Sequence, residues 1–303
     1  MIKTVSVIVT TYNSERTIER TLRSIVNQEG LGQEFAIELI VVDDCSIDRT
    51  VELVSHFDAI VLTTNENSGG PNKGRNMGLR RAGGDYICIV DHDDEWRPHK
   101  LMTQLPHLDN APIVSSGYSL ISIPLNGTTE KLKPLDEDVI YYESNETFLN
   151  KLSKSHKGQN SYMGSIIYRN ELKNILFEEV FGMSDFDWIL RMFHGRDSIE
   201  LNQSLYLRYV DGQNLSLNEA YRKRDFHFSL MHIEEYVKEY PQEVKKAYGR
   251  LYASRARYYY LMGKMDLARF YLLRSPLNLK NIGYYFTSFW GAEYIKKKFN
   301  VFG

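Results

Sequence analysis

The sequence predicts an α/β fold, with a doubly wound, mostly parallel sheet that carries helices on both faces, and a C-terminal α-helical extension. Three observations support this. Short runs rich in Val and Ile alternate with helical patterns in the first part of the chain, as βαβ crossovers require. After residue 217 the apolar residues recur at helical spacing instead. The 303 residues are 43% hydrophobic and 25% charged, which is close to the average of globular proteins.

Four apolar runs near the start of the chain are too short for helices and are typical of strands buried on both faces of a sheet. Helical patterns around Leu22, Leu53 and Met77 separate them, and the last pattern ends at the Gly83 and Gly84 pair. A helix over 143–152 follows later in the chain. The expected strands cover residues 5–9, 37–42, 59–62, 86–90, 112–116 and 165–168.

Cysteine content and hydropathy argue against a disulfide-framework protein and against a membrane-spanning one. Cys45 and Cys88 are the two cysteines, too few for a disulfide framework, so reduced and buried thiols are expected. No apolar stretch approaches the roughly 18 residues of a membrane-spanning helix. The first 13 residues turn polar at Thr10 and do not resemble a secretion signal. We therefore expect a cytoplasmic protein, and the sequence leaves open a peripheral position on the inner face of the plasma membrane.

The net charge of -2 conceals two halves of opposite sign. Residues 219–303 contain 16 Lys and Arg against 8 Asp and Glu, a balance of +8, which leaves 21 against 31, or -10, for residues 1–218. The basic half also holds 12 of the 21 tyrosines. Because charge and composition change together, we predict a domain boundary near Leu217, between regions 1–217 and 218–303.

Polar side chains follow each of the first four expected strands. In an open parallel sheet these positions lie at the carboxyl edge, where ligands bind. Asp and Asn are also common turn residues, but that alternative explains four separate clusters less well than it explains one. The clusters are Thr10 and Thr11, Asp43 and Asp44, Asn65 and Asn67, and Asp91, Asp93 and Asp94.

Two of these clusters suggest a ligand. Residues 91–94 place three carboxylates within four positions, which is costly unless a cation neutralises them. Oxygen donors without cysteine favour Mn²⁺ or Mg²⁺. The glycine-dense segment 67–78 carries Lys73 and Arg75, and these two cations suit a diphosphate. It matches neither a P-loop nor a dinucleotide fingerprint, and a solvated surface turn is the alternative.

Taken in order and spacing, residues 10–13, 41–50, 67–78 and 91–94 resemble the nucleotide-sugar-binding half of family 2 glycosyltransferases with the GT-A fold, among them bacterial enzymes of surface polysaccharide synthesis. The resemblance implies a GT-A domain over 1–217, with a nucleotide-sugar half at about 1–110 and an acceptor half at about 111–217. Residues 218–303 would then form a basic, aromatic-rich helical region.

The resemblance also implies a role for each matching residue. Thr10, Tyr12 and Asp44 would line the pocket for the nucleotide base, and Arg75 would face the nucleotide or its phosphates. Asp91 and Asp93 would contact the nucleotide, and Asp93 with Asp94 would hold Mn²⁺ or Mg²⁺. Arg208, in a stretch that resembles the closing strand of the family, is a weaker candidate for a contact to the diphosphate.

Residues 182–191 look like the acidic acceptor-site motif of the family. The family often has Glu where this chain has Ser184, and often Gly where it has Cys45. The first departure leaves the catalytic base open between Asp185 and Asp187. We favour Asp185, because it aligns with the usual catalytic Asp and because a helix N-terminus stabilises a carboxylate. An amphipathic helix with solvated acids is the alternative interpretation of this motif.

The implied activity is inverting, metal-dependent transfer of a sugar from a nucleotide-sugar, most simply a UDP-sugar, to a saccharide or lipid-linked saccharide in polysaccharide or glycoconjugate synthesis. A sugar nucleotidyltransferase is one alternative, but it would have a glycine-rich basic loop where this chain has residues 10–13. A non-catalytic nucleotide-binding scaffold is another, which the retained acids disfavour.

Other partners follow from charge and composition. The acidic first half argues against nucleic acid, and the sequence leaves a homodimer open. Residues 281–303 combine aromatic side chains at 284–290 with Lys296, Lys297 and Lys298, a composition that suits contact with an anionic membrane surface. A small helical bundle with a solvated basic face is the alternative.

Overall fold

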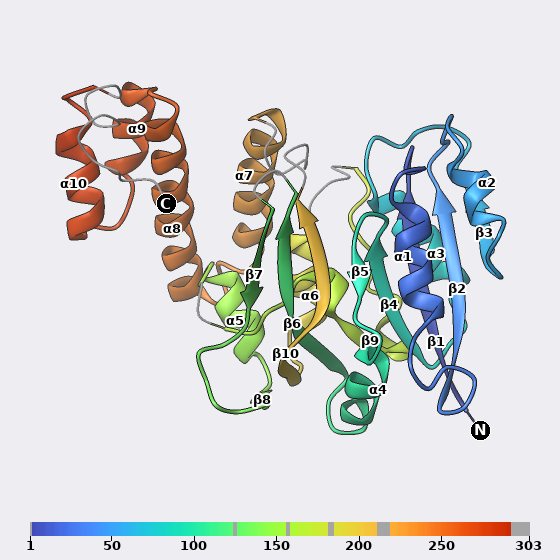
Figure 1. Ribbon diagram of the computed structural model, residues 1–303. Helices are drawn as coiled ribbons and strands as arrows, with labels where there is room; N and C mark the ends of the chain where they lie inside the picture. Colours follow the sequence, from blue (N-terminus) through green and yellow to red (C-terminus); the bar gives the residue numbers. More distant parts are fainter. Residues whose placement is uncertain (1, 124–125, 156–157, 181–184, 211–218, 292–303) are drawn as a thin grey trace. The chain divides into compact units, whose positions relative to one another are not determined.

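The computed structural model describes residues 2–123, 126–155, 158–180, 185–210 and 219–291. The chain divides into two compact units (Figure 1), an α/β unit of residues 1–148 with 158–221 and a helical unit of residues 149–157 with 222–303. The predicted α/β fold with C-terminal helices is confirmed. The boundary predicted after residue 217 falls in 211–218, outside the described residues.

One sheet forms the centre of the α/β unit, with the strand order β3-β2-β1-β4-β9-β6-β10-β5. The strands β1 to β4 pair in parallel, as do β6 and β10. The short strand β9 lies antiparallel to both of its neighbours, so the sheet as a whole is mixed. The strands on this path are β1 (Lys3–Thr11), β2 (Phe35–Asp43), β3 (Ile60–Thr63), β4 (Tyr86–Asp91), β5 (Glu95–Trp96), β6 (Ile113–Ser122), β9 (Ile167–Arg169) and β10 (Ser198–Val210).

Helices cover both faces of the parallel half, as expected. Helices α1 (Ile18–Val26) and α2 (Thr50–Val54) contribute to the core on the face of Val5, Val7 and Val9. Helix α3 (Asn72–Arg81) lies against the opposite face of β1. A Cβ on Gly78 would lie 2.4 Å from Ile8 Cγ2, and one on Gly74 would lie 3.1 Å from Thr10 Cγ2. The glycines of the dense segment therefore let α3 approach the sheet closely.

The other elements complete the sheet and its flanks. Two further strands extend it, since β7 (Gly127–Lys131) pairs with β6 and β8 (Val139–Tyr142) pairs with β10. The predicted helix over 143–152 is found as the slightly shorter α5. The remaining elements are α4 (Lys100–Gln104), η1 (Leu105–Asp109), α5 (Glu146–Leu152), η2 (Met163–Ser165), η3 (Asn170–Leu172) and α6 (Phe186–Phe193).

A lysine is fully enclosed in the core of the α/β unit. Lys100 has no exposed surface, its Nζ contacts Gln104 Oε1, and the same nitrogen lies 4.7 Å from the centroid of the Trp96 ring. Burial disfavours the charged ammonium and lowers the pKa of Lys100 to about 8. The fold therefore carries an energetic penalty for this charge at neutral pH.

We expect the stability of the protein to rise relative to that of Lys100→Met as the pH increases from 7 to 10. The folded chain releases the Lys100 proton near pH 8, whereas the unfolded chain keeps it to about pH 10.4. The free-energy penalty for the buried charge is thus complete below about pH 8, and it disappears as the pH rises from there to about 10.4. The shift corresponds to about 3 kcal/mol. Urea unfolding of both proteins at both pH values measures it, and a pH-independent difference would contradict the expectation.

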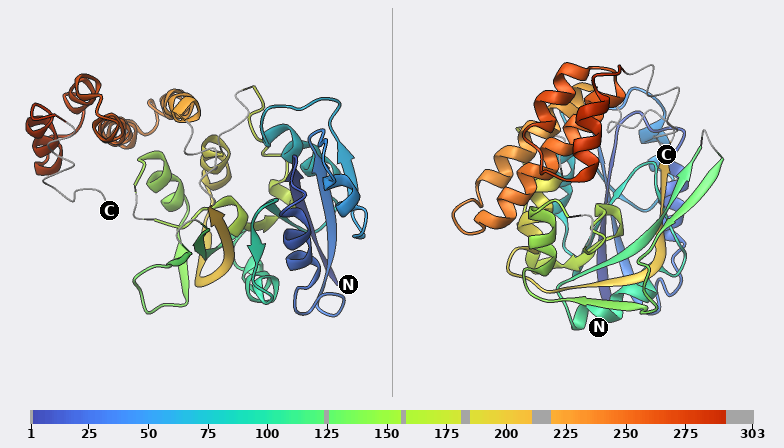
Figure 2. Two further views of the ribbon diagram at one scale, coloured as in Figure 1. Left: turned by 45° about the horizontal axis from the view of Figure 1, so that its top comes forward. Right: turned by 90° about the vertical axis from the view of Figure 1, so that its left-hand side faces the viewer.

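The helical unit contains α7 (Glu219–Glu234), α8 (Pro241–Leu261), α9 (Met265–Leu272) and α10 (Leu279–Thr287). Helices α8, α9 and α10 pack side by side (Figure 2). Their core is aromatic, as the tyrosine content suggests, and includes Tyr259 and Tyr260 with Ala268. No helix within the described ranges combines the length and the apolar composition that a bilayer span requires.

Candidate active site

The carboxyl ends of β1, β2 and β4 meet at one edge of the sheet. Thr10 of β1 is in register with Asp91 of β4, and Thr11 is in register with Asp43 of β2. The Asp44 N–H donates to the Thr11 carbonyl at 2.9 Å. Polar residues from separate strands therefore lie together, as the sheet topology predicts.

The two aspartates after β2 have different surroundings. Asp43 is buried and accepts hydrogen bonds from the Ser46 N–H at 2.9 Å and the Ser46 hydroxyl at 2.5 Å, so it stabilises the turn. The Asp44 carboxylate accepts from the Thr64 hydroxyl at 2.7 Å and from the Ser68 N–H at 2.9 Å. The segment after β3 thus fixes Asp44 in place. Ser68 lies within the glycine-dense segment, but a serine at this position does not by itself indicate a hydrogen bond to Asp44.

Thr10 and Tyr12, which the resemblance assigns to the base pocket with Asp44, differ in their exposure. Thr10 is buried, and Tyr12 is 43% exposed. Cys45 has φ of 64°, in the left-handed region that glycine adopts most readily, and its Sγ donates to the Thr64 carbonyl at 3.0 Å. This conformation gives a physical reason for the glycine that the resembling family often has there.

Arg75 is buried in the first turn of α3 with its guanidinium against the acidic motif. Nη2 lies 2.9 Å from Asp91 Oδ1, and Nη1 donates to Asn72 Oδ1 at 3.1 Å. Its Nε is buried and has no hydrogen-bond partner among the residues that the structure describes. The side chain also lies over the Phe177 ring, 5.2 Å from its centroid. A fixed cation is therefore present beside Asp91, and within the described ranges its Nε–H has no acceptor.

Asp94 is the most enclosed of the three acids in the motif, with 1% of its surface exposed. Its Oδ1 accepts from the Tyr209 N–H at 2.9 Å. Its Oδ2 accepts from the Tyr206 hydroxyl at 2.8 Å and the Tyr162 hydroxyl at 3.1 Å. Burial, and then the charges of Asp93 and Asp91, raise the pKa of Asp94 to about 8. Its assignment as a metal ligand stays a prediction, and the three hydrogen bonds disfavour it.

The donor set of this motif fits a divalent cation. The carboxylates of Asp91 and Asp93 are half-exposed, and hard ions such as Mg²⁺ and Mn²⁺ take oxygen ligands. Burial is the first cause of the raised pKa of Asp94, and the neighbouring charges of Asp93 and Asp91 add to it. A bound cation would offset the repulsion among these charges. Asp91 and Asp93 are the more accessible pair.

Two tyrosines of the site were not anticipated. The Tyr162 hydroxyl also lies 3.4 Å from Asp91 Oδ2, and the rings of Tyr162 and Tyr206 are 5.4 Å apart. The Arg208 guanidinium lies over the Tyr162 ring, 4.7 Å from its centroid. The alternation of Tyr206 and Arg208 along β10 was the available signal, since both side chains point to one face of the strand. Arg208 thus belongs to the surroundings of the acidic motif.

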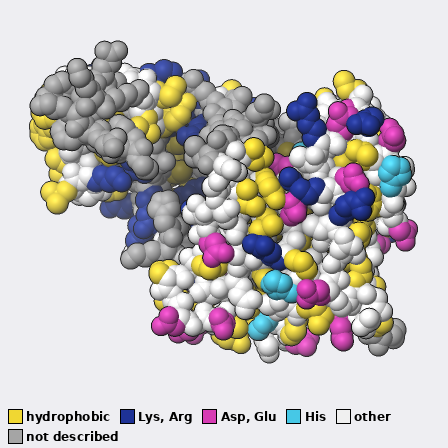
Figure 3. Space-filling view, in the orientation of Figure 1, with side chains coloured by type: hydrophobic (Ala, Val, Ile, Leu, Met, Phe, Trp, Pro, Cys, Tyr) yellow, Lys and Arg dark blue, Asp and Glu magenta, His cyan; other side chains and the backbone are white. Residues whose placement is uncertain are grey.

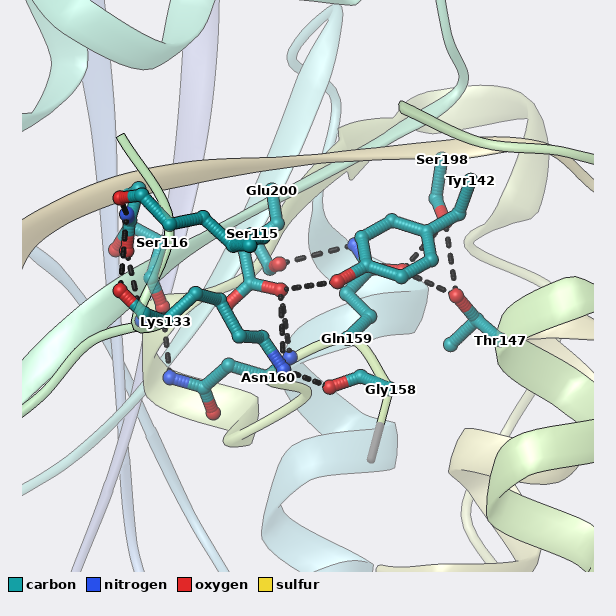
Figure 4. A network of polar contacts seen from close by, with 12 residues as sticks. Ser115, Ser116, Lys133, Tyr142, Thr147, Gly158, Gln159, Asn160, Ser198 and Glu200 are labelled. Carbon is teal, nitrogen blue, oxygen red and sulfur yellow. Dashed lines mark hydrogen bonds and ion pairs between the residues drawn. The ribbon is translucent and has the colours of Figure 1, made fainter. Parts of the chain in front are cut away.

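A buried polar network fixes the loop that carries Tyr162 (Figure 4). The Gln159 side chain is fully buried. Its Oε1 accepts from the hydroxyls of Thr147 at 2.6 Å and Ser198 at 2.5 Å, and its Nε2 donates to Ser115 Oγ at 2.9 Å. All hydrogen-bonding atoms of this amide are therefore used, a condition under which a buried polar group stabilises one conformation.

Glu200 extends the same network toward the site (Figure 4). Its carboxylate is buried and accepts from the Tyr142 hydroxyl at 2.8 Å and from the Asn160 N–H at 3.0 Å. The Lys133 ammonium lies 3.7 Å away. Because Asn160 is two residues before Tyr162, the network holds the Tyr162 hydroxyl toward the acids. Loop 158–164 is thereby a structural support of the acidic motif.

A second support connects α3 with α6 through residues 175–179. The Asn76 side chain is buried and forms two hydrogen bonds with Phe177, donating to its carbonyl and accepting from its N–H, each at 2.8 Å. The Trp188 ring of α6 stacks on Phe177 at 4.7 Å, and Trp188 Nε1 donates to the Ile175 carbonyl at 2.8 Å. The helix that begins after Asp185 is therefore tied to the helix that carries Arg75.

The two candidate bases differ in their hydrogen bonding. Asp185 is the N-cap residue of α6, it is half-exposed, and its side chain has no cap hydrogen bond. Asp187 is buried and accepts from Arg191, whose Nε lies 3.0 Å from Oδ2. Arg191 also donates to the Leu176 carbonyl at 2.7 Å. Residues 182–184 of the motif lie outside the described residues.

Comparisons with known proteins find similar chains among named glycosyltransferases. Poly(ribitol-phosphate) beta-N-acetylglucosaminyltransferase TarS of Staphylococcus aureus is 44% identical over 93 residues, 29% of this chain and 16% of that protein. GalNAc(5)-diNAcBac-PP-undecaprenol beta-1,3-glucosyltransferase of Campylobacter jejuni is 27% identical over 269 residues, 82% of this chain and 85% of that protein. The match thus spans about a sixth of TarS and most of the Campylobacter protein.

Solved structures share the fold. The TarS 1-349 complex with UDP-GlcNAc matches with a TM-score of 0.61 at 21% identity, covering 99% of this chain and 94% of that one. The mannosyltransferase PcManGT of Pyrobaculum calidifontis, in complex with GDP-Man and Mn²⁺, matches with a TM-score of 0.59 at 19% identity, covering 98% and 82%. The predicted GT-A fold is confirmed. The family model described as glycosyl transferase family 2 matches residues 6–191, more than half of the chain, and the chain therefore belongs to glycosyl transferase family 2.

Proposed function

We propose that this glycosyltransferase is inverting and metal-dependent, and that it moves a sugar from a UDP-sugar to a saccharide or lipid-linked saccharide. The observation that carries the proposal is the buried Arg75 against Asp91 at the carboxyl edge of the sheet, 2.9 Å apart, with Asp44 fixed nearby at the end of β2. In this arrangement Arg75 would face the diphosphate of the donor, and Asp44 would face its nucleotide base.

The donor pocket is supported by the rigid setting of Asp44. Hydrogen bonds to Ser68 and Thr11 hold its carboxylate and its backbone. A nucleotide base that binds there would therefore contact a carboxylate whose position is already fixed. TarS 1-349 has been solved with UDP and with UDP-GlcNAc, which supports a uracil nucleotide as the donor. Thr10 and Tyr12 complete the proposed pocket.

Departure of the nucleoside diphosphate creates negative charge that the site must stabilise. Arg75 is suited to this because its guanidinium is already desolvated and oriented by Asn72 and Asp91, so it needs little rearrangement when charge develops. Asp93 and Asp91, with Asp94 behind them, would hold Mn²⁺ or Mg²⁺, which supplies Lewis-acid stabilisation of the phosphate oxygens when it is bound. The Mn²⁺ in the PcManGT complex supports this assignment.

The acceptor hydroxyl must lose its proton as its oxygen attacks the anomeric carbon. We assign the proton to Asp185, because its side chain forms no N-cap hydrogen bond with α6, whereas Asp187 is already paired with Arg191. General bases of this kind act on a hydroxyl within hydrogen-bond reach. Attack from the side opposite to the leaving group is a single displacement, and it inverts the anomeric configuration.

The acceptor is proposed from the names of the relatives. One is named for poly(ribitol-phosphate) and the other for a PP-undecaprenol-linked glycan, so a saccharide chain or a lipid-linked saccharide is the class we propose, in polysaccharide or glycoconjugate synthesis. A cytoplasmic, membrane-peripheral location and a homodimer stay predictions.

Thermal unfolding with added nucleotides tests the proposal. We expect UDP and UDP-sugars with Mn²⁺ to raise the melting temperature, because a ligand at 100 times its dissociation constant stabilises the fold by about 2.7 kcal/mol. Excess chelator should remove both the shift and the sugar transfer. GDP and ADP are the matched controls. Stabilisation by a nucleoside triphosphate with a sugar 1-phosphate, but not by UDP-sugars, would support a nucleotidyltransferase instead.

A further inference from the structure

Helix α10 exposes an apolar face, whereas its packed side carries buried polar residues together with the half-buried Tyr284. Leu279, Ile282 and Phe286 recur at i, i+3 and i+7 and therefore share one face of the helix, and they are 90%, 39% and 63% exposed. On the opposite face, Asn281 and Ser288 are 5% and 2% exposed. A helix at the surface of a water-soluble protein has the reverse arrangement.

The packing of the helical unit fixes this orientation. Asn281 Nδ2 donates to the Pro276 carbonyl at 2.9 Å, and Pro276 in turn lies against Gly249 of α8, where an added Cβ would come within 2.7 Å of its Cγ. The Tyr260 hydroxyl donates to Thr287 Oγ1 at 2.8 Å. Hydrogen bonds of Asn281 and Thr287 thus hold this side of α10 against the helical unit. The apolar face is therefore left pointing outward.

The exposed apolar surface continues beyond α10 at both ends. In the segment before the helix, Leu273 is 68% and Leu277 is 93% exposed, and after it Phe289 and Trp290 are 61% and 57% exposed. Figure 3 shows hydrophobic side chains, with Lys or Arg side chains beside them, at the edge of the view where α10 lies. Exposed apolar surface of this extent marks an interaction site. We call these residues the α10 patch: Leu273, Leu277, Leu279, Ile282, Phe286, Phe289 and Trp290.

The charge of the patch selects its partner. From residue 266 to residue 291 the sequence contains Arg269, Arg274 and Lys280 and one acid, Asp266, which pairs with Arg269. Arg274 and Lys280 are exposed among the patch residues. A second copy of this chain would bring the same cations against themselves, whereas anionic lipid headgroups would neutralise them. Aromatic side chains such as Phe286 and Trp290 are favoured at the boundary between headgroups and acyl chains.

We propose that the α10 patch binds the surface of an anionic membrane, with its apolar side chains inserted among the lipids and Arg274 and Lys280 at the headgroups. The contact expected for residues 281–303 is thereby moved upstream, to residues 273–290. The lysines at 296–298 lie outside the described residues. The proposal is independent of the donor, the metal and the base assigned above, because it concerns a surface of the helical unit alone.

Sedimentation of the full chain with lipid vesicles tests the proposal. We expect binding to vesicles of phosphatidylcholine with phosphatidylglycerol and little binding to phosphatidylcholine alone. The triple variant Leu277→Ser, Leu279→Ser and Phe286→Ser should bind at least about tenfold more weakly, since three apolar anchors are lost. Arg274→Gln with Lys280→Gln should weaken binding to the anionic vesicles and reduce its dependence on salt.

A matched triple variant controls for general loss of exposed apolar surface. Ile123, Leu135 and Tyr141 of the α/β unit are 56%, 50% and 65% exposed, and their replacement by Ser should leave vesicle binding unchanged. Equal binding of the native chain to both kinds of vesicle, or equal binding of the patch variant and the native chain, would overturn the proposal. A dimer that the patch variant abolishes, without any effect of vesicles, would assign the patch to a second copy and overturn it as well.

Discussion

Asp185→Asn is expected to lower the turnover number for sugar transfer by about 10²-fold to 10⁴-fold, the usual contribution of a general base, while UDP binds as tightly as before. The amide cannot accept the proton of the acceptor hydroxyl, but it has nearly the size and shape of the carboxylate. Steady-state transfer assays, together with UDP titration by calorimetry, separate the two effects.

The neighbouring acid supplies the control. Asp187→Asn breaks the ion pair with Arg191, which also holds the Leu176 carbonyl, so we expect a lower melting temperature and a smaller, less selective loss of activity. If Asp187→Asn instead abolished transfer with the fold intact, and Asp185→Asn kept full activity, the base would be Asp187.

Replacement of Asp93 by Asn is expected to weaken Mn²⁺ binding and to reduce transfer by about 10²-fold to 10³-fold, as for the loss of one element of electrostatic stabilisation at a leaving group. The Asp93 carboxylate is half-exposed, so the free energy of unfolding of the metal-free protein should change by only about 1 kcal/mol. Calorimetric titration with Mn²⁺ and thermal unfolding measure the two quantities.

Asp94→Asn should show the opposite pattern. Its two oxygens accept three hydrogen bonds, and an amide nitrogen in place of one oxygen would face a donor, so we expect a loss of about 1–3 kcal/mol of stability. A variant that keeps its stability but loses Mn²⁺ binding would instead make Asp94 a ligand of the ion.

The sequence was a good guide to elements whose cause is local. The strands β1, β2 and β4 follow from runs of Val and Ile, and α1 follows from the spacing of Ile18, Leu22 and Ile25. Strand β9 is three residues long, and its antiparallel direction depends on partners far away in the chain. The glycine-dense segment suggested a loop that runs into a helix around Met77. The sequence did not indicate that Gly74 and Gly78 allow this helix to pack closely against β1.

The same distinction holds for the site. Asp44, Arg75 and the acids of 91–94 lie in compact motifs, so the sequence could propose them as candidates through their resemblance to the family. Tyr162 and Tyr206 bind an acid that is 68 and 112 positions away in the sequence. The alternation of Tyr206 and Arg208 indicates a shared face of β10, but it does not indicate that Asp94 is the partner. The burial that sets Asp94 apart from Asp93 also arises only when β10 and loop 158–164 close over it.

The paired hydrogen bonds between Asn76 and Phe177 have a consequence for how the reaction is prepared. Through them, helix α3, whose Arg75 would face the departing diphosphate, is connected to helix α6, whose Asp185 would accept the proton. The spacing between the two ends of the reaction is then established when the chain folds, and the arriving substrates need only dock into it. Folding would then already have supplied most of the entropy loss that orienting these two groups requires.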